Sequence, residues 1–234
     1  MIINNINIST FDMKLLTVDI QNREITNNST WTANAINPNF IKNTNGFKNI
    51  KLELLCKGIN RQTILNNISS LFCEFNKNKS NTVLLDNYDN NFICSLVNAQ
   101  TNKKSKTRYT LELELIGYEE STKETFIKIS DTDNHTITNN GTSITPCYLE
   151  IMPTFSYSSL TITGLSDDHI KINNITANKM IIIDGYTNKI TENGINKFND
   201  VELFEFPRLN VGNNIVKISD DRATLTVKWK ERFI

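Results

Sequence analysis

The chain has 234 residues, which is enough for one large β domain or two small ones with real cores. Lysine plus arginine and aspartate plus glutamate both number 25, so the formal net charge is zero. A general nucleic-acid binder needs a basic excess, so that class is excluded. No apolar stretch reaches the roughly 18 residues of a transmembrane helix, and the N-terminus lacks the pattern of a secretion signal.

Short alternation of apolar and polar residues dominates the first half of the chain. "KNIKLELLCKG" places Ile50, Leu52, Leu54 and Cys56 on one face, and "RYTLELELIGY" does the same with Leu111, Leu113 and Leu115. A period of two predicts strands with one buried face and one wet face. The sequence therefore predicts a sheet in which these two segments contribute to the same core.

One segment between these strands changes to helical spacing. "NRQTILNNISSLFCEF" has apolar residues three and four positions apart, which predicts an amphipathic helix over 61–75. Asn60 follows the break at Gly58 and is the expected N-cap. We interpret the apolar stripe as core packing, so the first domain is predicted to be α+β and dominated by sheet.

A predicted hairpin closes the first domain. "NFICSLVNAQ" and "TRYTLELELIG" flank a basic run made of Lys103, Lys104, Lys106 and Arg108. The run lies between two strands, so we interpret it as a solvated hairpin tip. The polar stretch that follows is the expected junction, which gives domains 1–125 and 126–234.

The second half predicts almost pure β structure. Short strands separated by turn residues suggest a sandwich or a partly closed barrel. "TITNNGTSITPCYLEI", residues 136–151, is expected to supply the first firm strand of the second domain. Asn140–Gly141 and Gly212 are expected to provide positive φ for tight turns, and Pro146 is expected at a strand edge or bulge.

No catalytic, cofactor-binding or metal-binding residues are predicted. The sequence has two histidines, His135 and His169, and each lies near an aspartate-rich stretch that we interpret as a surface turn. The cysteines at 56, 73, 94 and 147 have no CxxC spacing, and buried free thiols in a chain made in a reducing cytoplasm explain them better than metal ligation.

Two tryptophans leave a sugar-binding alternative open. Trp229 alternates with Val227 and is expected to pack structurally, whereas Trp31 lies in a polar loop that suits a protein contact. Aromatic rings can also stack on sugars, and Tyr148, Tyr157 and Tyr186 lie in the same half as Trp229. These aromatics are spread over separate segments, so tight sugar binding is not expected.

The order of phrases in the second half resembles the siphophage distal tail protein family. An Asn–Gly turn leads through a proline into a strand, a hairpin opens on an aspartate, and a Pro-rich turn precedes the last strands. Those positions are Asn140, Gly141, Pro146, Asp184, Pro207, Leu209, Gly212, Asn214, Trp229 and Phe233. The resemblance extends over the first half through "IKLELLCKG", the helix at 61–75 and "YTLELELIGYEE".

The resemblance implies a mainly β protein with an N-terminal β-sandwich-like domain that carries one helix. A C-terminal galectin-like β-sandwich follows, and the likeness to galectins concerns the fold alone. It also implies a structural protein of a virion, without enzymatic activity or cofactor. Such proteins form a homohexameric ring at the distal end of the phage tail, made mostly by the N-terminal domain. The ring joins the tail tube protein to tail-associated and receptor-binding proteins, and it is assembled in the host bacterial cytoplasm.

Two further hypotheses stay open. One is a carbohydrate-binding module for host cell-wall polysaccharide, which could be a monomer. The other is the equivalent ring protein of a contractile tail-like particle. A wall hydrolase is the weakest alternative, because the catalytic residue types are sparse and unpaired.

Overall fold

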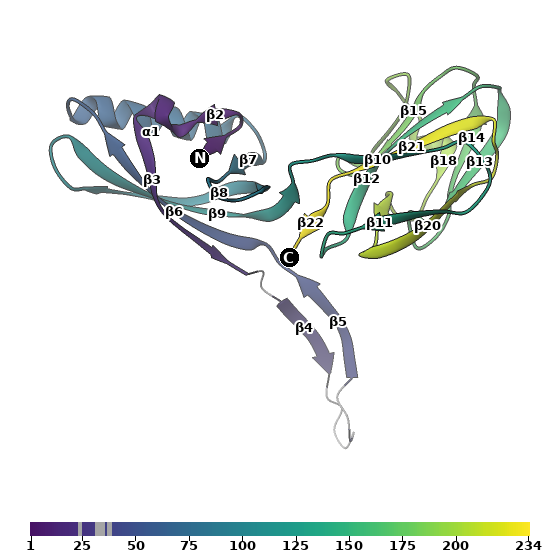
Figure 1. Ribbon diagram of the computed structural model, residues 1–234, viewed down its shortest axis with the longest axis horizontal. Helices are drawn as coiled ribbons and strands as arrows, with labels where there is room; N and C mark the ends of the chain where they lie inside the picture. Colours follow the sequence, from purple (N-terminus) through teal and green to yellow (C-terminus); the bar gives the residue numbers. More distant parts are fainter. Residues whose placement is uncertain (23–24, 31–35, 37–38) are drawn as a thin grey trace. The chain divides into compact units, whose positions relative to one another are not determined.

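The computed structural model describes residues 1–22, 25–30, 36 and 39–234 (Figure 1). The chain divides into two compact units, Met1–Glu120 with Ile234, and Ser121–Phe233. This division lies five residues before the junction expected from the sequence, because Thr125 already begins a strand of the second unit. The mainly β fold class is confirmed, and no described helix is long and apolar enough to cross a membrane.

The N-terminal unit is built on one antiparallel sheet with the strand order β2-β1-β7-β8-β9-β6-β3. Its strands are β1 (Ile2–Ile3), β2 (Ile6–Asn7), β3 (Met13–Gln21), β6 (Lys48–Lys57), β7 (Asn81–Leu84), β8 (Asn90–Lys103) and β9 (Arg108–Ser121). A 3-10 helix, η1 (Ile8–Phe11), precedes β3, and β4 (Ile25–Thr30) pairs with β5 (Asn39–Asn45) as a separate two-stranded sheet. The hairpin predicted on either side of the basic run is confirmed as β8 and β9.

The α-helix α1 (Arg61–Asn76) covers one face of this sheet (Figure 1). The helix predicted over 61–75 is thus confirmed, and Asn60 caps it by accepting a hydrogen bond from the Thr63 backbone N–H at 2.9 Å. The apolar stripe is buried through Ile64, Ile68, Leu71 and Phe75. These side chains share one core with the inward residues of β6 and β9, as the stripe and the alternation together predict.

The alternation also determines which cysteines are buried. Cys56 and Cys94 lie in the N-terminal core, where burial raises the pKa of Cys56 to about 11 and that of Cys94 to about 12. Cys147 is buried in the second unit, and burial raises its pKa as well. The expectation of burial is wrong for Cys73, which is exposed because it lies on the outer side of α1.

The C-terminal unit consists of two antiparallel sheets that enclose one core. One sheet has the order β10-β21-β12-β15-β16-β17, with β19 beside β12, and the other has the order β11-β20-β13-β14-β18. The first contains β10 (Thr125–Ile129), β21 (Ala223–Trp229), β12 (Thr145–Pro153), β15 (Ile181–Asp184), β16 (Lys189–Glu192), β17 (Ile195–Asn196) and β19 (Arg208–Leu209). The second contains β11 (His135–Asn139), β20 (Gly212–Ile218), β13 (Tyr157–Thr163), β14 (Ile170–Ile175) and β18 (Val201–Glu202). A 3-10 helix, η2 (Phe198–Asp200), and β22 (Arg232–Phe233) complete the unit.

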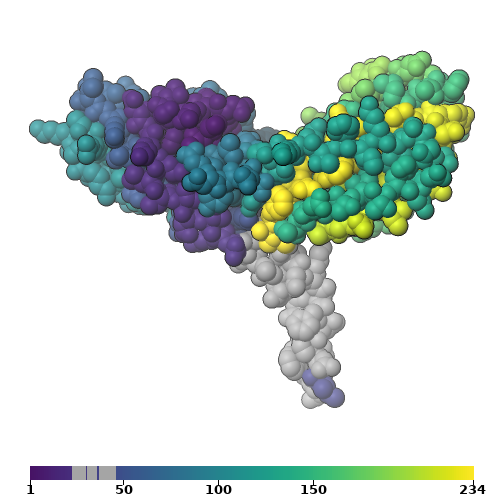
Figure 2. Space-filling model, viewed as in Figure 1, coloured from purple at the N-terminus to yellow at the C-terminus, as the bar shows by residue number. Residues whose placement is uncertain are grey.

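Both sheets contribute to the core of this unit, as in a β-sandwich. Leu149 and Val227 from the first sheet and Leu160 and Val216 from the second are each 0% exposed. Strands from the two ends of the unit lie side by side, since β21 is paired on one edge with β10 and on the other with β12. In Figure 2 the yellow residues near the C-terminus accordingly adjoin the teal residues that begin the unit.

Residues 136–151, expected to supply the first firm strand of the second unit, contain most of β11 and β12, but β10 precedes them. Two strands, β10 and β11, precede β12. β10 is an edge strand that pairs only with β21, and Phe126 on it is 61% exposed. The alternation of apolar and polar residues in β10 is therefore weak. In the sequence this segment resembles part of a polar connection, and the pattern of β12 is stronger.

Candidate assembly site

The residues that carry the family resemblance organise turns of the C-terminal unit. Asn139 is 1% exposed, and its side-chain amide donates to the Ser143 carbonyl at 3.2 Å, to Thr145 Oγ1 at 3.3 Å and to the Leu209 carbonyl at 3.5 Å. Its Oδ1 atom accepts the Gly141 N–H at 3.1 Å. One buried amide thus fixes the turn after β11 against strand β19, which contains Leu209.

The positive φ expected for Asn140–Gly141 is wrong. Neither residue belongs to the described positions with positive φ, whereas Gly212 does, with φ at 84°. Glycine is required at 141 for another reason, because a Cβ there would lie 2.5 Å from the Arg232 carbonyl oxygen. Asn140 strengthens the same contact, since its backbone N–H and side-chain amide both donate to Glu231 Oε1, at 3.2 and 3.0 Å.

Two further motif residues fix turns in the same way. Asp184 Oδ1 accepts the backbone N–H groups of Tyr186 at 2.8 Å and Thr187 at 3.1 Å, which closes the β15–β16 hairpin. Asn214 is buried, and it accepts the Asn210 N–H at 2.8 Å while its amide donates to the carbonyl of Gly212 at 3.0 Å. These short polar side chains replace backbone partners where the chain reverses, which is a scaffold role.

Each histidine pairs with an aspartate of its own segment. His135 Nε2 lies 2.7 Å from Asp131 Oδ1, and His169 Nδ1 lies 2.8 Å from Asp168 Oδ1. The hydrogen bond with His135 lowers the pKa of Asp131, and the His169 backbone N–H lowers that of Asp168. Within the ranges that the structure describes, no group of three potential metal ligands is brought together.

The aromatic side chains considered for sugar stacking are used inside the C-terminal unit. Trp229 is 4% exposed and packs in the core, which confirms its structural role. The Tyr157 ring is faced by the Arg222 guanidinium at 4.5 Å, and cations also face the rings of Tyr148 and Tyr186. Trp31 lies outside the described residues, so its expected protein contact stays a prediction.

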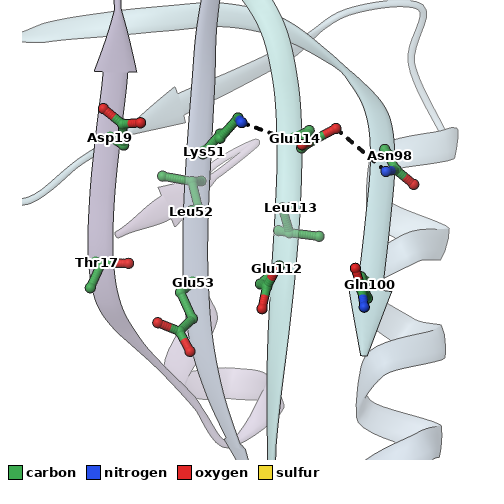
Figure 3. A pocket seen from close by; sticks show the side chains of 10 residues that line it. All are labelled: Thr17, Asp19, Lys51, Leu52, Glu53, Asn98, Gln100, Glu112, Leu113 and Glu114. Atoms are coloured by element: carbon green, nitrogen blue, oxygen red, sulfur yellow. Dashed lines mark hydrogen bonds and ion pairs between the residues drawn. The ribbon is translucent and has the colours of Figure 1, made fainter. Parts of the chain in front are cut away.

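The N-terminal sheet presents a polar surface on the side opposite α1. We call it the open face and define it by Thr17, Asp19, Lys51, Glu53, Asn98, Gln100, Glu112 and Glu114, which line a shallow hollow of about 270 Å³. Figure 3 shows these side chains in two rows across β3, β6, β9 and β8. Lys51 Nζ lies 3.7 Å from Glu114 Oε1, and the Asn98 amide donates to Glu114 Oε2 at 3.4 Å.

The second row of the open face brings two acidic groups together. Glu53 and Glu112 are directly opposite each other on β6 and β9. The Asn102 amide donates to Glu112 at 2.9 Å, whereas Glu53 and Asp19 have no hydrogen-bonding or ion-pairing partner among the described residues. Like charges directly opposed in a sheet are destabilising, so this row weakens an isolated unit.

A second charged group lies at the end of the same strands. We call Lys103, Lys104, Lys106 and Arg108 the basic tip, and all four residues are exposed, as the sequence predicts. The turn is closed by the backbone N–H groups of Lys104 and Ser105, which donate to the Arg108 carbonyl at 3.1 and 2.9 Å. Lys57 is directly opposite Arg108, so this end of the sheet also holds a pair of like charges.

Sequence reasoning does not single out the open face. The signal is present in "KLELL" and "LELEL", where glutamates occupy the wet positions of two strands. Glu53 lies opposite Glu112 only in the observed register. A shift of β6 by two residues along β9 could place Lys51 opposite Glu112 instead.

Residues 140–233 match the family described as the siphovirus-type tail component, C-terminal domain. No curated protein matches the chain by sequence. Among solved structures, SPP1 Dit (gp 19.1) matches with a TM-score of 0.79 at 9% identity, covering 100% of this chain and 98% of that chain. It is described as a paradigm of the hub adsorption apparatus in phages that infect Gram-positive bacteria.

Chains of the phage P2 baseplate in its activated conformation also match. With calcium the TM-score is 0.54 at 10% identity, and with strontium it is 0.56 at 12% identity; each match covers 97% of this chain and 94% of that chain. At such identities the likeness concerns the fold, and it extends over both units. Residues 140–233 are therefore similar to the siphovirus-type tail component family, and the chain as a whole has the fold of SPP1 Dit.

Proposed function

We propose that this protein is a structural distal tail protein, the baseplate hub of a bacteriophage or prophage. The observation that carries the proposal is the match to SPP1 Dit, which covers 100% of this chain and therefore both of its units. The family match over residues 140–233 supports it independently of the structure. A fold is shared more widely than a function, so the family match adds weight that the fold alone would not have.

In this function the chain has no enzymatic role and acts by joining other proteins. Copies of the N-terminal unit form a closed ring of six, which connects the tail tube to tail-tip and receptor-binding proteins at the distal end of the virion tail. The unpaired charges of the open face and the basic tip support an assembly role for this unit, because such groups gain partners only in a complex. A closed ring leaves no such surface without a partner at its ends.

The test is electron microscopy of purified tails together with mass measurement of the isolated protein. The expected result is six-fold density for this chain at the distal end of the tail, located by an antibody against the C-terminal unit. Mass measurement of concentrated protein is expected to show a hexamer. A protein that is monomeric in concentrated solution and absent from purified tails would contradict the proposal.

A further inference from the structure

The charges on the wet side of β6 and β9 are segregated along the strands. Lys57 is opposite Arg108 at one end, and Glu53 is opposite Glu112 four residues further along each strand. Four residues of strand span roughly 13 Å, which exceeds the distance of about 8 Å over which salt screens charges at physiological strength. The basic end therefore does little to neutralise the acidic row within one copy.

The open face and the basic tip carry charges of opposite sign and similar number. Asp19, Glu53, Glu112 and Glu114 outnumber Lys51 on the open face, and the basic tip holds only cations. In the described part of the chain, the tip side chains and Lys57 have no ion-pairing partner. The whole chain has zero formal net charge, so an association of identical copies through these groups leaves no excess charge.

We infer that the basic tip of one copy docks on the open face of the next copy. This inference rests on the proposed ring and specifies its contact. The tip is a two-stranded projection between β8 and β9, and the open face is a shallow hollow lined by β3, β6, β8 and β9 (Figure 3). Because the donor and acceptor surfaces differ, the contact is head to tail, and such a contact forms a ring when the rotation between neighbouring copies closes.

Charge reversal tests this contact in three proteins. The face variant carries Glu53→Lys and Glu112→Lys, the tip variant carries Lys104→Glu and Lys106→Glu, and the combined variant carries all four changes. All the altered side chains lie on the wet side or on the turn, so folding is checked by circular dichroism and thermal unfolding. The control variant, Lys79→Glu with Lys189→Glu, reverses two exposed lysines outside both surfaces.

Mass photometry and electron microscopy then give the assembly state. The face and tip variants are each expected to weaken ring formation by roughly a hundredfold or more, because like charges then meet across the contact. The combined variant is expected to regain the ring. An equal mixture of the face and tip variants is also expected to form rings, since the two can alternate around an even-numbered ring.

The outcomes separate the inference from the proposed function. Rings of undiminished stability in both the face and the tip variant would overturn the contact and leave the proposed hub intact. Loss of the ring in the control variant as well would also overturn the contact, since any charge reversal would then suffice. A wild-type chain that forms no ring in solution and is absent from tails would overturn the proposed function itself.

Discussion

The sheets of the two units differ in how their charged side chains are paired across strands. In the C-terminal unit, charged side chains pair across strands. Lys228 Nζ lies 2.5 Å from Glu150 Oε1, and Lys171 Nζ lies 3.1 Å from Glu202 Oε1. In the N-terminal unit, the cross-strand neighbours Glu53 and Glu112 have the same charge. The C-terminal unit thus pairs these charges across its strands, whereas the N-terminal unit pairs Lys51 with Glu114 but places Glu53 opposite another glutamate.

A second difference concerns what covers the sheets. Each sheet of the C-terminal unit packs one face against the other sheet, and the core is closed from both sides. The N-terminal sheet has α1 on one face and leaves the other face polar. The comparison teaches that the C-terminal unit is stabilised as a sandwich of two sheets, whereas the N-terminal sheet has one apolar face under α1 and one polar face.

The largest expected effect tests whether the units are separate. Leu54 and Leu149 are both 0% exposed, one in each core. Leu54→Ala is expected to lower the unfolding free energy of the N-terminal unit by about 2–5 kcal/mol, and Leu149→Ala that of the C-terminal unit by a similar amount. Differential scanning calorimetry of each variant should show one transition shifted and the other unchanged. Two transitions that always move together would show that the units unfold as one.

The next largest effect concerns the turn held against Arg232. Gly141→Val is expected to destabilise the C-terminal unit by about 3 kcal/mol, because the new Cβ would lie too close to a backbone oxygen. Gly194 has a φ of +82° and nothing within 4 Å of an added Cβ, so Gly194→Ala is expected to cost about 1 kcal/mol through backbone strain. The N-terminal transition serves as the internal control. Equal effects of the two substitutions would argue against the close-approach explanation.

A smaller effect is expected at the start of α1. Asn60→Ala removes the acceptor of the Thr63 N–H and is expected to lower the stability of the N-terminal unit by about 1 kcal/mol. Asn60→Ser keeps an N-cap acceptor and should retain most of that stability. Chemical denaturation of both variants measures the difference, and an alanine variant as stable as the wild type would show that the cap contributes nothing.

The smallest effect for any single group is expected under acid. Five carboxyl groups of the C-terminal unit have pKa values lowered by hydrogen bonds: Asp131, Asp168, Asp200, Glu202 and Asp220. A carboxyl group whose folded pKa is lowered contributes stability that is present above its unfolded pKa and is lost as pH falls through the folded pKa. The C-terminal transition should therefore fall in temperature as the pH drops below about 4.

The N-terminal unit provides the contrast in the same experiment. The five carboxyl groups with lowered pKa values all lie in the C-terminal unit, so the loss of stability in acid that they cause is expected there and not in the N-terminal unit. Calorimetry over a pH series should show that, as the pH is lowered, the unfolding temperature of the C-terminal unit decreases before that of the N-terminal unit. If the unfolding temperature of the N-terminal unit decreased first, the proposed difference in charge pairing between the two units would be wrong.

Much of the fold was predictable because periodicity reports burial directly. The stripe of α1 and the alternation of β6 and β9 each have enough buried positions to stand out. β10 stands out less from the polar residues around it, because an edge strand with an exposed Phe126 has a weaker pattern. Gly141 was assigned the wrong cause, because an approach by Arg232, 91 positions away, leaves no local signal.

The candidate site was less predictable than the fold. The basic tip could be located from its lysines and the strands around it, since both are local in sequence. The open face depends on which residue of β6 is opposite which residue of β9, and on the bulge in the pairing of β3 between Leu15 and Thr17. Alternation assigns a side chain to a face but does not assign its neighbour on the next strand.

The pairing of β10 with β21 also has a consequence for synthesis. Thr125 is opposite Trp229, so the strand that pairs with β10 is synthesised roughly a hundred residues after it. At bacterial and eukaryotic elongation rates this interval is about 5–20 s, during which β10 has no strand to pair with. Most of the N-terminal sheet can form in that time, because its strands from β1 to β9 have already been made and only the short β22 is still missing. Nascent chains would therefore carry a largely formed N-terminal sheet together with an incomplete C-terminal sandwich, and chaperone binding would protect the chain most during that interval.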